Sequence, residues 1–505
     1  AGVDHHRRTL VMPGLADPDV LAIHDDLFVL TGTSTTVSLP FFASTDLVTF
    51  TPLATYDPSA LDPAHSYCDV WAPDLARQGD TFHLYFSARR VAKGAACTGQ
   101  DVTTFHATAP DQAMNFGAPE LFDSGGGPAS RLTPGCAAAG CERTVRIDAA
   151  LVGPPDDRWF FYVWFDQGNN VSSFRLGAPG GVVSNAGPAR FALPAVEEGI
   201  NEGPDVFARE GRQYLFFSSA WYNSQYAMSY VMGDSIGDLT RQRAVRRHSR
   251  AERAGDGRLV QSHGHNSVVA RRGEFFNVFH QGAFDGAGKM TGRSTFKQRL
   301  AFRPDGSLHT LNLVDVRWSQ LPGHVYSLDA VRHDGTVVGP CIGAPVIGDA
   351  TAVTFNGVCP SAGDLLLDKG EVAAWRLYTS NDGTWSNHVD LPYDGVSDDV
   401  FFDLPGGSLR AVSLRWNEKA THTEYSIDVR RADGTWVAPC VADVVLGTRI
   451  GHVFDGSCPS AKTSVAPGEV TEFRVCSAVN NDWAHATCGS APSDGHRGQI
   501  DVLIP

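Results

Sequence analysis

The chain has 505 residues, of which 42% are hydrophobic and 19% are charged, and it carries a formal net charge of −15 at pH 7. This length predicts two or three domains, and the acidic balance argues against nucleic acid or an anionic membrane as a partner, because both require a basic surface. No apolar run of the sequence approaches the roughly 18 residues that a membrane-spanning helix needs. A neutral polymer is therefore the natural candidate partner.

Residues 1–305 repeat one short pattern. A polar or charged signature is followed, about eleven positions later, by a strand core rich in aromatic residues, and this happens five times. A fixed internal spacing of this kind is typical of repeat architectures. The signatures are Asp17-Pro18-Asp19-Val20, Trp71-Ala72-Pro73-Asp74, Ile147-Asp148-Ala149-Ala150, Glu202-Gly203-Pro204-Asp205 and Gly264-His265-Asn266-Ser267.

This repeat predicts an all-β fold, because turn-forming residues, including many of the 52 glycines, recur between short aromatic or β-branched runs. Closing five such units into a ring would point the distinctive residue of each first strand at one axis. Three of the five signatures carry a carboxylate, and cleavage of a glycosidic bond needs paired carboxylates. The pattern therefore predicts a five-bladed β-propeller hydrolase over residues 1–305.

A different repeat begins after residue 305, with an offset of about 98 residues. Arg317-Trp318 returns as Arg415-Trp416, and Cys359-Pro360-Ser361-Ala362 returns as Cys458-Pro459-Ser460-Ala461. Each copy has short alternating strands separated by Gly and Asp turns. We expect two small β-sandwich domains, residues 306–405 and residues 406–505, each stapled by one disulfide.

The ten cysteines lack the tight C-x2-C pairs of a zinc site and favour disulfides, which imply an oxidising compartment. We expect a secreted protein whose leader is absent from this chain. The closely spaced pairs are Cys136 and Cys141, Cys341 and Cys359, Cys440 and Cys458, and Cys476 and Cys488.

At its signatures the chain resembles glycoside hydrolase family 43, a group of arabinan- and xylan-degrading enzymes. The resemblance covers about residues 10–305 and rests on the signatures occurring together and in order, among them Glu202-Gly203-Pro204-Asp205 and Gly264-His265-Asn266-Ser267. It implies a five-bladed propeller and hydrolysis with inversion. In one departure, the usual Ile-Asp-Pro-Ser reads Ile147-Asp148-Ala149-Ala150 here.

The same resemblance implies roles for four polar residues. Asp17 would be the general base that activates water, and Glu202 the general acid that protonates the leaving oxygen. Asp148 would orient the acid and raise its pKa. His265 would lie near the axis, beside a bound calcium ion (Ca²⁺).

Four further residues are expected to bind a polysaccharide or oligosaccharide substrate. The resemblance implies that Trp71 forms an aromatic floor for a sugar ring and that Arg293 is a basic residue near the active site. Phe42 and Trp221 come from a pool of aromatic residues suited to stack on the apolar faces of sugars. We expect a monomeric enzyme with no organic cofactor.

Two rival functions remain open at this point. A fructan hydrolase would share the five-bladed fold, but such enzymes normally begin with an Asn-Asp-Pro-Asn type motif, and here Ala16 precedes Asp17. A non-catalytic carbohydrate-binding propeller would be expected to have lost a carboxylate, and all three are present. The inverting cleavage of arabinofuranosyl or xylosyl linkages is therefore the leading hypothesis.

Overall fold

The computed structural model describes the chain in eleven stretches. Strands account for nearly all regular structure within them, which confirms the all-β prediction. The predicted Cys136/Cys141 pair lies outside the described residues. The described residues are 6–98, 102–122, 146–165, 169–176, 182–189, 200–239, 244–343, 347, 350–419, 423–441 and 450–505.

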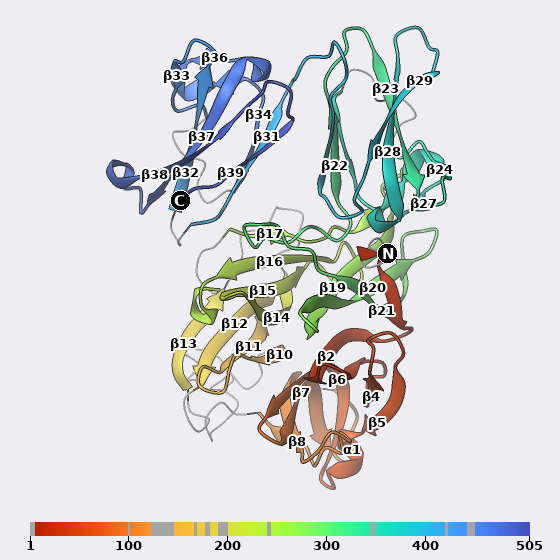
Figure 1. Cartoon of the computed structure of the whole chain (residues 1–505). Helices are drawn as coiled ribbons and strands as arrows, with labels where there is room; N and C mark the ends of the chain where they lie inside the picture. Colours follow the sequence, from red (N-terminus) through yellow and green to blue (C-terminus); the bar gives the residue numbers. More distant parts are fainter. Residues whose placement is uncertain are drawn as a thin grey trace.

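Five sheets are formed by residues 9–299 (Figure 1). The first contains β2 (Ala16–His24), β3 (Leu27–Thr33), β4 (Leu39–Ser44) and β5 (Thr51–Tyr56). The second contains β6 (His65–Gln78), β7 (Thr81–Ala92), β8 (Thr103–Ala109) and β9 (Glu120–Leu121). The third contains β10 (Arg146–Val152), β11 (Trp159–Phe165), β12 (Asn169–Leu176) and β13 (Val182–Ala189).

The fourth sheet contains β14 (Asn201–Arg209), β15 (Arg212–Ser219), β16 (Ala227–Gly233) and β17 (Arg246–Arg247). The fifth contains β18 (Glu252–Arg253), β19 (Leu259–Arg271), β20 (Glu274–Phe284), β21 (Met290–Arg299) and the N-terminal strand β1 (Thr9–Met12). Five inner strands contact one another in a closed cycle, in the order β2, β6, β10, β14, β19 and back to β2. Because β1 pairs with β21, the start of the chain completes the last sheet.

An apolar cluster fills each of the five junctions between neighbouring sheets. The aromatic second strands supply both sides of these clusters, because successive side chains of a strand point to opposite faces. In β11, for example, Phe160 packs toward the second sheet and Phe161 toward the fourth. In β15, Tyr214 and Leu215 separate in the same way. The alternation explains why these strands are apolar on both faces.

Each of the five inner strands carries a β-bulge at its signature. Two residues bulge out of register in every case, for example Asp17 and Pro18 between the pairs Ala16/Thr33 and Asp19/Thr31. The first bulged residue has a positive φ, which costs energy for any residue except glycine. These residues are Asp17 (φ 45°), Ala72 (45°), Asp148 (55°), Gly203 (57°) and His265 (48°).

The backbone N–H of each left-handed residue is held by a side chain of the preceding sheet. Four acceptors lie on second strands, and in the remaining case Asp148 itself accepts from Gly203. The pairs are Asp17 N to His280 Nδ1 (3.2 Å), Ala72 N to Thr33 Oγ1 (2.9 Å), Asp148 N to Ser87 Oγ (3.2 Å), Gly203 N to Asp148 Oδ2 (3.0 Å) and His265 N to Ser218 Oγ (2.7 Å). These bonds fix the bulges that the strain would otherwise disfavour.

Two residues further on, a second set of bonds joins the inner strands. Here the side chain of one strand accepts the backbone N–H of the next strand in the cycle. The four pairs are Leu75 N to Asp19 Oδ2 (2.6 Å), Leu151 N to Asp74 Oδ2 (3.0 Å), Val268 N to Asp205 Oδ2 (2.8 Å) and Val20 N to Ser267 Oγ (3.2 Å). The third sheet has Ala150 at this position, so it offers no acceptor to Val206.

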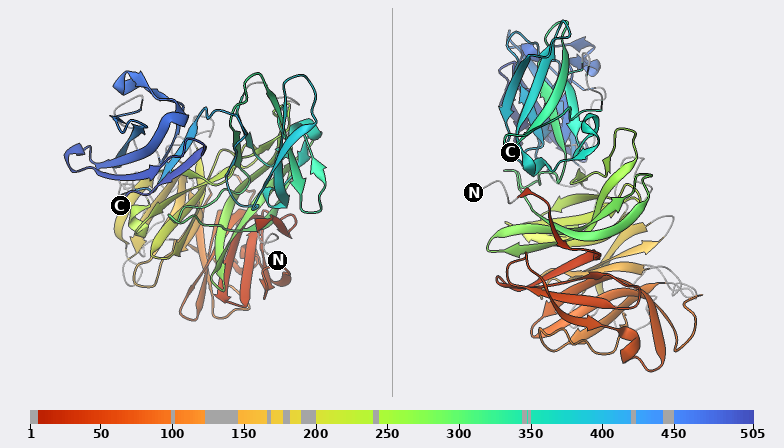
Figure 2. Two further views of the ribbon diagram at one scale, coloured as in Figure 1. Left: turned by 45° about the horizontal axis from the view of Figure 1, so that its top comes forward. Right: turned by 90° about the vertical axis from the view of Figure 1, so that its right-hand side faces the viewer.

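Beyond residue 305 the chain forms two units with matching strand order, shown in cyan and blue in Figures 1 and 2. In the first, the strands are β22 (Val314–Trp318), β25 (Ala352–Phe355) and β30 (Asp399–Phe402), then β23 (Val325–Arg332), β24 (Val337–Val338), β28 (Val372–Ser380) and β29 (Asn387–Pro392), then β26 (Val358–Cys359) and β27 (Leu365–Leu366). The first two sheets share one apolar cluster.

The second unit repeats this order and also has one shared cluster. Its strands are β31 (Val412–Trp416), β34 (Gly451–Phe454) and β39 (Gln499–Val502), then β32 (Thr423–Arg431), β33 (Trp436–Val437), β37 (Val470–Val479) and β38 (Thr487–Pro492), then β35 (Ser457–Cys458) and β36 (Thr463–Ser464). Helical structure is limited, among the described residues, to α1 (Pro58–Leu61), η4 (Ile236–Asp238), η5 (Pro360–Ala362), η6 (Lys369–Glu371), η7 (Pro459–Ala461), η8 (Pro467–Glu469) and η9 (Trp483–His485).

Four disulfides link the described cysteines. Three are the predicted pairs Cys341–Cys359, Cys440–Cys458 and Cys476–Cys488. The fourth, Cys68–Cys97, joins residues 29 positions apart and was not predicted. No helix within the described stretches has the length and apolarity to cross a membrane.

The missing hydrogen-bond acceptor at Ala150 leads to a stability prediction. Ala150→Ser would place a hydroxyl where the other inner strands have an acceptor, and we expect it to raise the free energy of unfolding by about 1 kcal/mol, the net value of one intramolecular hydrogen bond. Denaturant unfolding measures the change. The control is Ala149→Ser at the neighbouring buried position, where a hydroxyl has no such partner and should destabilise. Equal effects of the two variants would contradict the prediction.

Candidate active site

Three of the five left-handed positions carry an ionisable side chain, and these side chains meet at the centre of the strand cycle. His265 Nδ1 lies 3.5 Å from Asp17 Oδ1 and 4.0 Å from Asp148 Oδ2. The other two positions are small, Ala72 and Gly203. A Cβ on Gly203 would lie 3.1 Å from His265 Cγ, so the glycine leaves room for the imidazole.

Asp17 is buried and surrounded by basic groups. Arg293 Nη1 donates to its Oδ1 at 3.0 Å, and His280 Nδ1 lies 3.2 Å from the same oxygen. Burial alone would raise its pKa, but Arg293 and His265 outweigh burial and hold the pKa of Asp17 well below its usual value. Asp17 is therefore an ionised carboxylate.

Glu202 has the opposite environment and lies on β14, the inner strand that follows the β10 strand of Asp148. It is 9% exposed, and burial, together with the nearby charge of Asp148, raises its pKa to about 7. Asn169 Nδ2 donates to Oε2 at 2.6 Å, and the Tyr226 hydroxyl donates a second bond that favours the ionised form. Glu202 can therefore hold a proton near neutral pH and release it to a substrate.

Asp148 links these two carboxyl groups. Burial and the charge of Asp17 raise its pKa to about 7, and its Oδ2 accepts the Gly203 N–H at 3.0 Å. Gly203 directly follows Glu202, so this bond fixes the backbone that carries Glu202. Since like charges disfavour double ionisation, Asp148 and Glu202 share a tendency to keep a proton.

Three supporting residues were not predicted from the sequence: Asn169, Tyr226 and His280. They lie on the second or third strands or next to them, where no signature marks them. The sequence held one signal for Tyr226, namely the glycine Gly264 directly before His265. A Cβ there would lie 2.0 Å from Tyr226 Cε1, so glycine is required for the tyrosine ring, which stacks 5.3 Å from His280.

The predicted substrate-binding residues divide into two groups. Arg293 joins the carboxylate site directly, and its guanidinium lies 4.6 Å from the ring centroid of Tyr222. Next to Tyr222, Trp221 is 49% exposed, and Trp71 is partly exposed beside the left-handed Ala72. Phe42, by contrast, lies on β4 and packs against the apolar cluster between the first and fifth sheets.

The calcium ion expected near His265, with its water shell, stays a prediction, because water can supply most of the oxygen ligands of such an ion. Ca²⁺ takes about six to eight oxygen ligands, and the described residues contain no group of three or more His, Cys, Asp or Glu side chains placed to hold a metal. The oxygens closest to His265 already accept from Arg293 and Gly203. The described side chains alone therefore do not form a calcium site here.

A cavity of about 670 Å³ lies elsewhere, between the sheets and the two C-terminal units. Tyr230, Arg303, Asp398 and Trp416 are among the described residues that line it, and no signature residue is. It is a space at the junction of three parts of the chain, separate from the carboxylate site.

Comparisons with known proteins identify the family of the chain. The sequence profile of glycosyl hydrolases family 43 matches residues 8–308. A thermostable family-43 glycoside hydrolase is 20% identical (TM-score 0.44, 58% of this chain and 92% of that one). An α-L-arabinofuranosidase from Lactobacillus brevis is 17% identical (TM-score 0.45, 61% and 96%).

A variant of the family-43 protein BlXynB from Bacillus licheniformis is 12% identical, with a TM-score of 0.44, and the match covers 96% of this chain and 88% of that one. A comparison with curated proteins finds no match.

The raised pKa of Glu202 predicts a loss of activity above pH about 7, because a general acid must be protonated. Asp148→Asn removes the like charge that raises this pKa, so the alkaline limb of kcat against pH should move to lower pH, by about one unit. A pH–rate profile of both proteins measures the shift. An unmoved alkaline limb would contradict the assignment of the acid.

Tyr226→Phe should move the same limb in the other direction. The tyrosine hydroxyl stabilises the ionised form of Glu202, so its loss should raise the Glu202 pKa by roughly half a unit to one unit. The opposite signs of the two variants separate an electrostatic effect on Glu202 from general damage to the site. Shifts of the same sign would refute this interpretation.

Proposed function

Because the chain belongs to glycoside hydrolase family 43, we propose that it cleaves arabinofuranosyl or xylosyl linkages in polysaccharide by an inverting mechanism. The observation that carries the proposal is the pairing of an ionised Asp17 with a Glu202 whose pKa is raised to about 7 on one cycle of strands. Inverting hydrolysis needs one carboxylate base and one carboxylic acid.

The proposal includes the architecture that presents this pair. The closed contact order of the inner strands supports a five-bladed propeller over residues 1–305, in which each sheet is a blade. The single apolar cluster shared by two sheets in each C-terminal unit supports two β-sandwiches, residues 306–405 and 406–505. The four disulfides support a secreted enzyme, since disulfides persist in oxidising compartments.

In the proposed reaction Asp17 accepts a proton from a water molecule as the water oxygen attacks the anomeric carbon. Glu202 donates its proton to the glycosidic oxygen, the bond from that oxygen to the anomeric carbon breaks, and the leaving sugar departs as an alcohol. Water enters on the face opposite the leaving group, so the anomeric configuration inverts. Arg293 keeps Asp17 ionised and thus able to act as the base.

The neighbouring groups prepare the acid. Asp148 raises the pKa of Glu202 by its charge and holds the Gly203 N–H. Asn169 and Tyr226 orient the Glu202 carboxyl group from two directions. His265 lies between Asp17 and Asp148 and adds to the positive potential that favours an ionised Asp17.

Substrate contact is proposed for the exposed aromatic pair Trp221 and Tyr222 and for Trp71. Tyr222 lies against Arg293, which binds Asp17, so a sugar stacked on this pair would end beside the base. Phe42 is better explained by its packing between two sheets. The substrate class itself follows from the family resemblance rather than from these contacts.

The experiment is hydrolysis of arabinan, arabinogalactan, arabinoxylan, xylan and levan, with product anomers followed by NMR. We expect inverted products from an arabinose- or xylose-containing polymer, and a loss of at least about 10³-fold in Glu202→Gln, because protonation of the leaving group contributes on this scale. The matched control is Glu210→Gln, an exposed glutamate in the turn that joins β14 to β15.

Each other outcome overturns a defined part of the proposal. Retained anomers would make Asp17 a nucleophile and favour the fructan-type reaction. Binding of a polymer without cleavage would make the propeller a recognition module. Equal losses in the two glutamate variants would remove Glu202 from the reaction.

A further inference from the structure

An arginine near the start of the chain occupies a buried site that the proposed reaction does not use. The Arg8 side chain is 8% exposed. Its Nη1 donates to Glu252 Oε1 at 2.8 Å, and its Nε and backbone N both donate to Asp368 Oδ2 at 2.9 Å. Nη1 also lies 2.8 Å from His263 Nε2 and 3.1 Å from Gln281 Oε1. One guanidinium therefore contacts four other side chains.

These partners come from two different parts of the molecule. Glu252, His263 and Gln281 belong to β18, β19 and β20 of the fifth sheet, whereas Asp368 caps η6 in the first C-terminal unit. The N-terminal segment consequently lies between the sheets and that unit, as the position of the N-terminus in Figures 1 and 2 illustrates.

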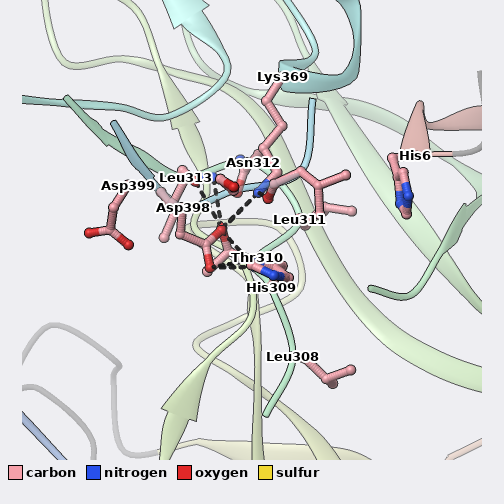
Figure 3. Close-up of polar contacts among 12 residues, drawn as sticks. His6, Leu308, His309, Thr310, Leu311, Asn312, Leu313, Lys369, Asp398 and Asp399 are labelled. Carbon is pink, nitrogen blue, oxygen red and sulfur yellow. Dashed lines mark hydrogen bonds and ion pairs between the residues drawn. The ribbon is translucent and has the colours of Figure 1, made fainter. Parts of the chain in front are cut away.

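The same edge of the first unit is held by a second buried charge cluster. Lys369, which follows Asp368, is 2% exposed and donates to Asp398 Oδ1 at 2.8 Å. Asp398 also accepts the Thr310 N–H at 2.9 Å (Figure 3) and pairs with Arg303. Arg303 lies just beyond β21 (Met290–Arg299), so its pairing with Asp398 fixes the first unit against the fifth sheet at a second point.

The Arg8 contacts lie one residue pair away from the catalytic site. His263 and Gln281 are partners across β19 and β20, and the next pair is Gly264 and His280. His280 lies 3.2 Å from Asp17, and Gly264 gives room to Tyr226, the tyrosine that donates to Glu202. A displacement of the His263/Gln281 pair would thus reach the supports of both the base and the acid.

We propose that Arg8 is a positioning residue through which the first C-terminal unit holds the catalytic ends of β19 and β20. The first unit is then part of the support of the active site. The catalytic consequence rests on the proposed function, but the coupling of Asp368 to His263 and His280 does not.

The second C-terminal unit shows that this role belongs to one copy of the duplication. Its corresponding turn, η8, begins with Pro467 in place of Lys369, and its cap is Ala466 in place of Asp368. Instead, the second unit contacts the sheets through a buried ion pair of its own, Arg246 Nη1 with Glu418 Oε2 at 2.7 Å. Arg246 lies on β17, the strand of the fourth sheet farthest from its inner strand.

This second ion pair provides a matched control. Asp368→Asn and Glu418→Gln each remove one buried carboxylate that joins a C-terminal unit to the sheets, and asparagine keeps the oxygen that caps η6. We expect Asp368→Asn to lower kcat by about tenfold with KM within about twofold of the wild-type value. Glu418→Gln should leave kcat and KM unchanged within about twofold, even if its melting temperature falls as much as that of Asp368→Asn.

A measurement without substrate tests the coupling directly. Since an arginine only donates, His263 Nε2 must accept from Arg8, and ¹⁵N spectra of histidine side chains should report this tautomer in the wild type. Asp368→Asn should shift or broaden the signals of His263 and His280, and Glu418→Gln should not. Arg8→Lys keeps the positive charge but loses the planar guanidinium that binds several acceptors at once. It should shift or broaden the same two histidine signals, and it replaces Asp368→Asn if Asp368→Asn does not fold.

The outcomes separate this inference from the proposed function. Unchanged histidine spectra in Asp368→Asn and Arg8→Lys, or equal loss of kcat in both carboxylate variants, would overturn the positioning role. A wild-type protein that cleaves no polymer, with histidine signals that respond only to Asp368 and Arg8, would overturn the proposed reaction and retain the coupling.

Discussion

The site depends on one backbone constraint, the bulge at the signature of each of the five inner strands. A left-handed residue inside a strand is unfavourable, and here each one is stabilised because the neighbouring sheet accepts its N–H. The same bonds join successive sheets, so closing the cycle and turning the signature side chains toward its centre are one event. This explains why functional residues stand at the bulges, where a strand can re-aim a side chain without losing its pairing.

Neighbouring charges then divide chemically similar groups. Asp17 and Asp148 occupy equivalent bulge positions, yet the pKa of Asp17 is held well below its usual value and that of Asp148 is raised to about 7. The difference arises from Arg293, which binds Asp17 directly, and from the negative charge of Asp17, which raises the pKa of Asp148. A single arginine from the fifth sheet thus keeps Asp17 ionised, which in the proposed reaction suits Asp17 to act as the base.

The sequence predicted the elements that repeat and missed those that do not. The spacing of the signatures located Asp17, Asp148, Glu202 and His265, and the structure shows why they recur, since each stands at a bulge. It also shows that Glu202 and Trp71 precede the left-handed residue, whereas Asp17, Asp148 and His265 occupy it. Asn169 and Tyr226 could not be found in this way, because their positions depend on how one sheet packs beside the next. For the same reason Cys68 and Cys97, which are 29 residues apart, gave no local signal.

The two C-terminal copies differ in how they contact the strand cycle. Two copies with the same strand order would be interchangeable if each only enlarged the molecule. Instead the first copy has the charged cap Asp368 and the buried Lys369, whereas the second has Ala466 and Pro467 at these places. A buried charge is costly unless it is paired. Asp368 can pair with Arg8 only when the N-terminal segment, the fifth sheet and the first unit are assembled together. The divergence of the two copies therefore records which of them the catalytic end of the fifth sheet relies on.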